Sequence, residues 1–342
     1  MKSFLHTPVS PITLDENPGV QKLVEDMGKT AFQGRNISIA RDIWLNMIKD
    51  ETTIFLGLAG AMVPAGMRIL IASLIKNRLV DCIVSTGANL FHDCHETLGR
   101  LHWQGSPHID DLDLLKKGID RIYDVFAEEK EFERTDNFIE KWVVELEQYR
   151  PYTTREFLYL LGEKLSKEGK EEGILTSAYK ENIPIYCPAI ADSSIGIAIA
   201  LGKQAGTNNM QLDTIADVLE ITDIVGASKS TGVIYIGGGV PKNFIQQTQV
   251  VGRLLDADKA GGHKYGIQIS TDAPHWGGLS GCSFKEAKSW GKIASEALCV
   301  SVYSDATIAF PLIASATLSS SKDILKRRKF PRFKMGRKLE VL

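Results

Sequence analysis

Short, uninterrupted apolar runs recur along the chain and alternate with longer stretches of helical periodicity. The runs predict six buried strands, at residues 53–58, 80–86, 183–188, 233–236, 265–270 and 299–303. A helix is predicted at residues 67–79, and another is expected to start near Gly19 and to include Val20, Leu23 and Val24. Strands covered on both faces carry continuous apolar sequence, and helices between them form the crossovers. The alternation therefore predicts an α/β fold with a doubly wound, mainly parallel, Rossmann-like sheet.

The same pattern divides the chain into an arm, one domain and a tail. Residues 1–20 hold several prolines and little periodicity, which predicts an extended N-terminal arm. Residues 21–320 then form a single α/β domain. Within it, residues 110–182 are rich in charged and aromatic side chains and predict consecutive helices, including one at 154–167, as a helical insertion. Residues 321–342 are basic. We interpret them as a solvated tail, with contact to RNA or to an acidic partner as the alternative.

Composition narrows the class of protein. With 342 residues, of which 44% are hydrophobic, the chain is long enough to bury a large core. A net charge of −2 argues against a nucleic-acid-binding surface as the main feature. The five cysteines are scattered and form no CxxC pair, as expected for thiols in a reducing compartment. Residues 1–8 lack the apolar core of a signal peptide, and no uncharged apolar run is long enough to span a membrane. We therefore expect a cytoplasmic protein with neither membrane nor nucleic acid as a partner.

Glycine and small polar residues follow several of the predicted strands. Gly60 and Ala61 come after the first strand, Thr86 and Gly87 after the second, and Gly237-Gly238-Gly239 after the strand at 233–236. Each group runs into a predicted helix, whose free N–H groups can hold phosphate oxygens. No GxGxxG fingerprint is present, and tight turns explain isolated glycines equally well. The spacing alone therefore leaves dinucleotide binding open.

A lysine beside an aromatic residue ends the segment 283–292. Ser283 and Glu286 have the spacing of a capping box, which predicts a helix start. Gly291 separates Trp290 from Lys292, and a lysine amine held against an aromatic wall is desolvated, which favours its neutral, nucleophilic form. The alternative is an ordinary solvated lysine near a helix C-terminus. In a regular helix Trp290 and Lys292 point to nearly opposite sides. Either Gly291 ends the helix, or the two side chains serve different walls of a site.

Residues 286–293, Glu-Ala-Lys-Ser-Trp-Gly-Lys-Ile, resemble the active-site segment of deoxyhypusine synthases, in which the lysine after Ser-Trp-Gly carries a covalent imine. Other segments match in the family's order, and the similarity covers roughly residues 25–320. These segments are Phe55-Leu56-Gly57, Pro188-Ala189 through Asp192, Gly237 to Val240 with Lys242, and Val302 to Ala306 with Phe310-Pro311.

The resemblance implies NAD as the cofactor and a homotetramer with NAD at the subunit interfaces. It places the cofactor contacts at Gly60, Ala61, Thr86, Gly87, Asp192, Gly238, Thr271, Asp305 and Ala306. At residues 60–64 this chain has Gly-Ala-Met-Val-Pro where the family usually has a turn containing Ser-Asn. Backbone contacts to the cofactor survive that change, whereas side-chain contacts do not.

The resemblance also implies the reaction. Spermidine is oxidised to an imine, the amine of Lys292 captures its four-carbon aminobutyl group with release of 1,3-diaminopropane, and an acceptor amine then takes the group from the lysine. Lys292 is thus the expected catalytic residue. The expected substrate-binding residues are Glu286, Trp290, Lys242, Asn243, His92 and His275. Glu286 supplies a carboxylate for cationic amines, and Trp290 supplies a cation–π wall.

Several polyamine contacts depart from the family. Ile197 and Leu279 stand where deoxyhypusine synthases have aspartates, Asn243 replaces a histidine, and His275-Trp276 replaces a phenylalanine and an aspartate. Homospermidine synthases of the same family transfer the aminobutyl group to putrescine, so a small diamine acceptor is the preferred hypothesis. A protein lysine as acceptor, and a catalytically silent NAD-binding relative, remain alternatives.

Histidines cluster between the second strand and the helical insertion. Helical spacing brings His92, His95 or Glu96, and His102 near one face. A metal site is conceivable, but there is no HExxH motif and no cysteine pair, so polar or site-lining histidines are favoured and no metal is predicted. His92 occupies a position where eukaryotic members of the family carry a glutamate near the cofactor and the polyamine.

Overall fold

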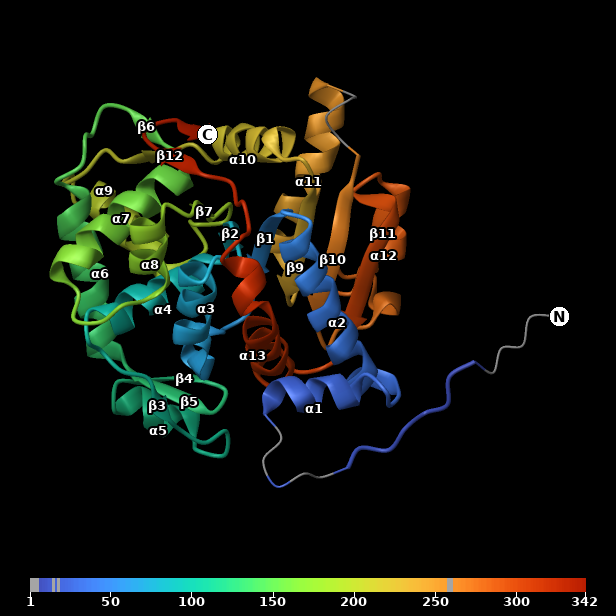
Figure 1. The fold of residues 1–342 in the computed structure, drawn as a ribbon. Coiled ribbons are helices and arrows are strands. Elements are labelled where there is room, and N and C mark those ends of the chain that lie inside the picture. The colour runs from blue at the N-terminus through green and yellow to red at the C-terminus, as the bar shows by residue number, and fades with distance from the viewer. Residues whose placement is uncertain (1–5, 14–15, 17–18, 257–260) are drawn as a thin grey trace.

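A six-stranded parallel sheet forms the centre of the protein (Figure 1). The computed structural model describes residues 6–13, 16, 19–256 and 261–342. The strands follow the order β11-β10-β9-β1-β2-β7, and every neighbouring pair is parallel. Their bounds are β1 Thr53–Leu58, β2 Cys82–Ser85, β7 Ile185–Tyr186, β9 Thr231–Ile236, β10 His263–Ile269 and β11 Ile293–Val302. The six predicted strands and the predicted doubly wound α/β fold are confirmed.

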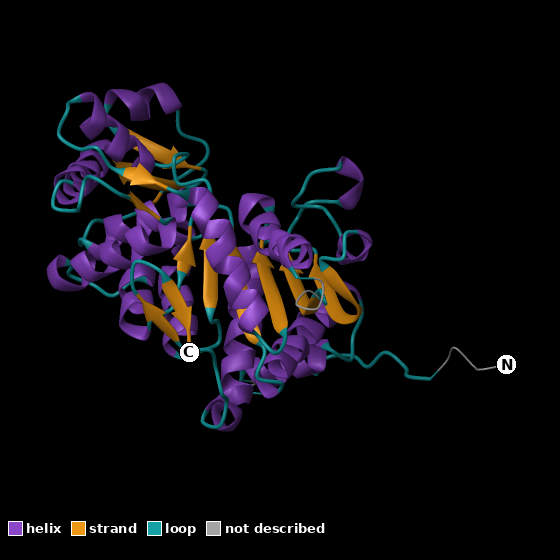
Figure 2. Cartoon of the chain, turned by 90° about the horizontal axis from the view of Figure 1, so that it is seen from above, coloured by secondary structure: helices purple, strands orange, loops and turns teal. Residues whose placement is uncertain are grey.

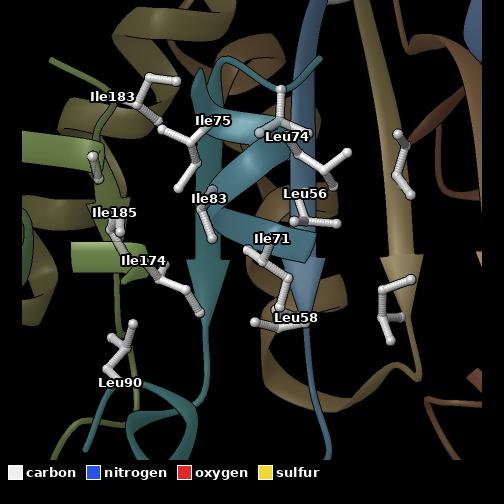
Figure 3. Packing of buried hydrophobic residues seen from close by; sticks show 14 of the residues in the cluster. Leu56, Leu58, Ile71, Leu74, Ile75, Ile83, Leu90, Ile174, Ile183 and Ile185 are labelled. Atoms are coloured by element: carbon white, nitrogen blue, oxygen red, sulfur yellow. The ribbon is translucent and has the colours of Figure 1, made fainter. Parts of the chain in front are cut away.

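Alternate residues of each strand face two different layers of helices. In β1, Ile54, Leu56 and Leu58 belong to the larger apolar core, beneath α2 (Phe32–Lys49), α3 (Arg68–Lys76) and α13 (Ala306–Leu325). Phe55 belongs to the smaller core, with α10 (Thr214–Ala227), α11 (Gly239–Leu255) and α12 (Phe284–Ser289). Figure 3 shows the first set, in which Leu56, Leu58 and Ile83 of the sheet meet Ile71, Leu74 and Ile75 of α3. Figure 2 shows helices on both sides of the strands. The strands β1, β2 and β9 are therefore buried throughout, which explains their continuous apolar runs, whereas the edge strand β11 is partly exposed.

Helices make up most of the remaining chain. Their bounds are α1 Val20–Met27, α2 Phe32–Lys49, α3 Arg68–Lys76, α4 Gly87–Thr97, α5 Asp111–Lys116, α6 Glu129–Val143, α7 Thr154–Glu168, α8 Ile174–Glu181, α9 Ser194–Gln204, α10 Thr214–Ala227, α11 Gly239–Leu255, α12 Phe284–Ser289 and α13 Ala306–Leu325. A π-helical turn at Val63–Met67 precedes α3, and a 3₁₀ turn at Pro274–Trp276 precedes α12. The helices predicted at 67–79 and 154–167 and the one near Gly19 are present. Residues 6–13, the part of the predicted arm that is described without interruption, contain no helix or strand.

The prediction of consecutive helices for residues 110–182 is partly wrong. Helices α5, α6, α7 and most of α8 lie there, but β4 (Ile119–Ile122) and β5 (Val125–Glu128) form an antiparallel hairpin, which β3 (Trp103–Gln104) extends to three strands. Tyr123, with φ 54°, makes the turn. Each strand is short and half-exposed, so charged residues interrupt its apolar pattern. Another short strand in this region, β6 (Pro151–Tyr152), pairs with β8 (Gln211–Leu212).

The prediction of a solvated C-terminal tail is also partly wrong. Residues after α13 form a hairpin of β12 (Phe333–Met335) and β13 (Leu339–Val341), and Phe333 and Leu339 are buried in the smaller core. Arg328 is buried, and its guanidinium is paired with the buried carboxylate of Asp81. A run of basic residues in the sequence does not show which of them pairs with a buried carboxylate, so the structural role of Arg328 could not be predicted.

Asp217, on α10, predicts a dependence of stability on pH. Its carboxylate accepts hydrogen bonds from Thr154 N (3.0 Å) and Thr154 Oγ1 (2.6 Å), and burial raises its pKa from 3.8 to about 7. Between about pH 4 and pH 7 the folded protein therefore retains a proton that the unfolded chain has lost. The contribution of Asp217 to the free energy of unfolding thus falls as pH rises, by up to about 1.4 kcal/mol per pH unit.

Replacing Asp217 with asparagine, which still accepts from Thr154 N, is expected to flatten the profile of stability against pH between pH 4 and 7. Urea denaturation at several pH values measures it. Asp223→Asn, at an exposed position of the same helix, is the control. Equal slopes in the unaltered protein and in Asp217→Asn would contradict the assignment.

Candidate active site

Gly291 ends α12 and turns the chain into β11. Ser283 Oγ accepts a hydrogen bond from Glu286 N (3.1 Å), so the predicted cap is present at the start of this helix. Gly291 has φ 67°, and a Cβ there would lie 2.0 Å from Arg253 Nη1. The left-handed conformation favours glycine here, whereas the Arg253 guanidinium lies at the end of a flexible side chain and could move. Of the two possibilities for Trp290 and Lys292, the break of the helix at Gly291 is the one observed.

The break brings Lys292, Trp290 and Asn243 together. Lys292 Nζ donates to Asn243 Oδ1 at 3.1 Å and lies 5.3 Å from the centroid of the Trp290 ring. Lys292 is half-buried, whereas Trp290 is 62% exposed. A single amide oxygen therefore orients the amine beside an open aromatic face, and the remaining N–H directions are available to a ligand.

Lys242 lies on the first turn of α11 and is buried. Its ammonium group donates to Gln268 Oε1 (3.0 Å), Leu279 O (3.2 Å) and Cys282 O (2.6 Å). Burial lowers the pKa of Lys242 to about 8, and the nearby Glu286 carboxylate partly opposes this. An ammonium group has three donors, and here protein acceptors take all of them. The geometry thus gives Lys242 the task of holding residues 279–282, which lead into α12.

The carboxyl ends of the parallel strands form a glycine-lined edge. Gly238 leads into α11, and a Cβ there would lie 2.4 Å from Ser280 Cα, so only glycine lets the two segments meet. Gly87, the first residue of α4, has the same constraint, because its Cβ would lie 2.4 Å from Ser193 Oγ. Both helices present free N–H groups at this edge, which suits a phosphate-bearing dinucleotide.

Asn89 joins the turns after β1 and β2. Its Nδ2 donates to Gly60 O (2.8 Å) and Thr86 Oγ1 (3.1 Å), and its Oδ1 accepts from Val63 N (3.2 Å). Gly60 has φ 76°, as the turn requires. The predicted cofactor residues Gly60, Ala61, Thr86 and Gly87 are therefore held in one place.

The other predicted cofactor residues lie after the remaining strands. Asp192 follows β7 and Thr271 follows β10, and both are exposed. Asp305 caps α13, accepting from Thr307 N (2.7 Å) and Thr307 Oγ1 (2.6 Å), and Ala306 begins that helix. Because parallel strands end at one edge of the sheet, all these positions share it with Gly238.

The predicted histidine cluster forms a hydrogen-bonded chain. His102 Nδ1 lies 2.7 Å from Glu96 Oε1, and His102 Nε2 lies 3.0 Å from His92 Nδ1. Phe132, which the sequence did not mark, packs its ring against His92, His95 and His102. Burial, with repulsion from neighbouring histidines, lowers the pKa of His92 to about 3 and that of His95 to about 4. In the described part of the chain, no three or more His, Cys, Asp or Glu side chains are arranged to hold a metal ion.

Comparison with known proteins shows the family. The deoxyhypusine synthase family profile matches residues 22–317. Probable deoxyhypusine synthase 2 of Methanosarcina acetivorans is 51% identical over 94% of this chain and 92% of its own length. The chain belongs to the deoxyhypusine synthase family. Its members are aminobutyl transferases, as the resemblance of residues 286–293 implied.

A second sequence relative and a solved structure are also similar to this chain. Probable deoxyhypusine synthase 1 of the same M. acetivorans is 40% identical, over 91% of this chain and 95% of its own length. A crystal structure of a putative deoxyhypusine synthase from Entamoeba histolytica covers 91% of this chain and 97% of that one, with a TM-score of 0.63 and 21% identity. That likeness supports the fold.

Four residues that depart from the family's polyamine contacts lie on the surface of the protein. Ile197, on α9, is 52% exposed, and Leu279 is 36% exposed. His275 and Trp276 are also exposed, with ring centroids 4.5 Å apart. Apolar and aromatic groups thus stand where the family resemblance implies carboxylates.

None of the helices in the described ranges is long and apolar enough to cross a membrane.

Proposed function

We propose that the protein is an NAD-dependent aminobutyl transferase that moves a 4-aminobutyl group from spermidine, or a related polyamine, to a small diamine such as putrescine. The observation that carries the proposal is the position of Lys292. Lys292 comes directly after the helix break at Gly291. Its Nζ atom donates to Asn243 Oδ1 at 3.1 Å and lies beside the exposed ring of Trp290.

Each residue has a distinct task in this function. Lys292 supplies the amine that forms the imine with the aminobutyl group, and Asn243 accepts one of its N–H bonds, which orients the nitrogen lone pair. Trp290 covers the cationic substrate on one side. Glu286, exposed on α12, offers a carboxylate to an ammonium group. Lys242 holds residues 279–282, the segment that leads into α12, through its three hydrogen bonds.

NAD would supply the hydride acceptor for the oxidation and the donor for the final reduction. The residues present fit such a group, because the N-termini of α4 and α11 open at the glycine-lined edge with close approaches that exclude a Cβ. Gly60, Ala61, Thr86, Gly87 and Gly238 would hold it, together with Asp192, Thr271, Asp305 and Ala306.

The exposed apolar groups support a change in amine recognition. A polyamine anchored by two carboxylates would lose several kcal/mol, on the order of the paired-charge energies of such contacts, if both were replaced. Ile197 and Leu279 are such replacements. In M. acetivorans two relatives coexist, and this chain is closer to the second (51%) than to the first (40%). Two members in one organism are consistent with two different acceptors.

The test is incubation of the purified protein with NAD and spermidine, with and without putrescine, and mass spectrometry of the amines. Homospermidine together with 1,3-diaminopropane is the expected result. Release of 1,3-diaminopropane without homospermidine would favour a protein lysine as acceptor. No release with any of a panel of polyamines would overturn the proposal and favour a silent NAD-binding relative.

We also propose a cytoplasmic homo-oligomer, with a tetramer as the expected state. Ile197 and Leu201 of α9, and Ile215 and Leu219 of α10, are each more than half exposed. Exposed apolar groups on these two helices, which follow each other in the chain, suit contact with a second copy. Light scattering of the purified protein measures this state.

A further inference from the structure

The side chain of Asn89, on the first turn of α4, is polar and completely buried. Its neighbours leave one orientation of the carboxamide. Val63 N is a donor, so the atom 3.2 Å from it is the oxygen Oδ1. Gly60 O only accepts, so the atom 2.8 Å from it is the nitrogen Nδ2. The second hydrogen of Nδ2 goes to Thr86 Oγ1 at 3.1 Å. Exchanging the oxygen and the nitrogen would lose all three bonds.

This orientation decides the role of the Thr86 hydroxyl. Thr86 precedes α4 as its N-cap residue, but its side chain accepts no hydrogen bond from the helix backbone. Its oxygen accepts from Asn89 instead, and a hydroxyl oxygen that accepts still has its own hydrogen to donate. No residue that the structure describes accepts this hydrogen. Thr86 is half-buried, so the hydroxyl is a donor within reach of a ligand.

The peptide group between Gly60 and Ala61 is oriented by the same carboxamide. No peptide bond in the described part of the chain is cis, and in a trans peptide the C=O and N–H groups point in opposite directions. Because Gly60 O faces Asn89, the N–H of Ala61 points away from it. Within the described residues, Ala61 N has no acceptor, and Ala61 is half-buried next to the exposed Gly60. Ala61 N–H is therefore a second free donor.

The two donors are neighbours at the carboxyl edge of the sheet. The groups that carry them are bonded to one nitrogen atom, at 2.8 and 3.1 Å, and both acceptor atoms face that nitrogen. Two donors with no acceptor between them suit an oxygen that only accepts, such as that of a phosphate group, and do not suit an ammonium group. Residues 60–64 lack the Ser-Asn side chains that are usual in the family, and this arrangement needs no side chain from them.

We propose that Asn89 is a positioning residue, which orients Thr86 Oγ1–H and Ala61 N–H as a donor pair for an acceptor oxygen of the bound dinucleotide. The choice of a dinucleotide rests on the proposed function. Asn89 itself bonds only to the protein and acts through the donor pair. The polarity of the pair assigns the turns after β1 and β2 to the cofactor and not to the cationic ends of the amine substrate.

The test is a fluorescence titration of the full-length protein with NADH. Thr86→Val keeps the shape of the side chain and removes the hydroxyl. It is expected to weaken NADH binding about tenfold, the scale of one lost hydrogen bond to a charged group. Thr86→Ser restores the hydroxyl and is expected to recover most of the affinity. Because both variants leave Asn89 in place, they decide the role of the hydroxyl even if a variant of the buried Asn89 does not fold.

A double-mutant cycle isolates the positioning role of Asn89. Asn89→Ala is expected to weaken NADH binding at least tenfold when Thr86 is present. In the Thr86→Val background the loss should be about threefold, because only the Ala61 donor is left to misplace. A purely structural role of Asn89 would give the same factor in both backgrounds. Asn137→Ala, at an exposed position on α6, is the matched control and should bind NADH like the unaltered protein.

The outcomes separate this proposal from the proposed function. Unchanged NADH affinity in Thr86→Val, or the same factor for Asn89→Ala in both backgrounds, overturns the donor pair. If homospermidine is formed all the same, the proposed function stands. NADH binding that depends on Thr86 and Asn89, in a protein that never releases 1,3-diaminopropane, supports the donor pair and overturns the transferase proposal alone. No NADH binding by the unaltered protein overturns both.

Discussion

Replacing Lys292 with alanine is expected to lower amine transfer by about 10³-fold or more while leaving the fold and dinucleotide binding unchanged. The amine of Lys292 is the group that Asn243 orients beside Trp290, and no other described lysine has an amine in that position. Lys242 cannot take over, because its three donors are held by Gln268, Leu279 and Cys282. Without the nucleophile, the aminobutyl group has no covalent carrier.

The measurement is borohydride trapping after incubation with NAD and spermidine, followed by mass spectrometry of the intact protein and of its peptides. The unaltered protein should carry a reduced aminobutyl adduct on Lys292, and the variant none. Lys285→Ala is the matched control, since Lys285 is exposed on α12, the helix that precedes Lys292, and its side chain makes no hydrogen bond to any residue that the structure describes. An adduct at another lysine, or full transfer by Lys292→Ala, would contradict the assignment.

Local signals predicted the fold and part of the site. Strands such as β1 and β9 are buried on both faces, so their sequences are continuously apolar and easy to identify. The cap at Ser283 and the break at Gly291 depend on residues within a few positions of each other. Spacing alone therefore limited Trp290 and Lys292 to two arrangements, of which the structure has one.

Contacts between distant segments could not be predicted in this way. Asn243 and Lys292 are 49 positions apart, and the bonds from Lys242 to Leu279 and Cys282 span 37 and 40 positions. The hairpin of β4 and β5 was missed because its half-exposed strands carry charges between their apolar residues. The carboxamide of Asn89 bonds to residues 26 and 29 positions away, so no local pattern marks it.

The C-terminal segment shows the same limit and leads to the largest expected effect on stability. Arg328 Nη2 donates to Thr52 O (2.7 Å) and to Asp81 Oδ2, and Nη1 donates to Asp81 Oδ1 (3.2 Å). Asp81 also accepts from Ile54 N (2.8 Å), at the second residue of β1. Both charged side chains are completely buried. The pair thus fastens the segment after α13 to the centre of the sheet, at the end opposite the glycine-lined edge.

Replacing Arg328 with methionine is expected to lower the free energy of unfolding by about 3–5 kcal/mol, because it leaves a buried carboxylate without its cation. Burial already raises the pKa of Asp81 despite Arg328, so the unpaired carboxylate would take up a proton more readily. Urea denaturation measures the change. Arg327→Met, at the exposed neighbouring position, is the control and should stay within about 0.5 kcal/mol.

The double variant Asp81→Asn with Arg328→Met separates the pair from its surroundings. Asparagine keeps an acceptor for Ile54 N and carries no charge, so the double variant should recover a substantial part of the stability that Arg328→Met loses. Equal stability of the single and double variants would show that the cost comes from lost packing and from the bond to Thr52 O. A single variant as stable as the unaltered protein would mean that the segment after α13 is held by the burial of Phe333 and Leu339 alone.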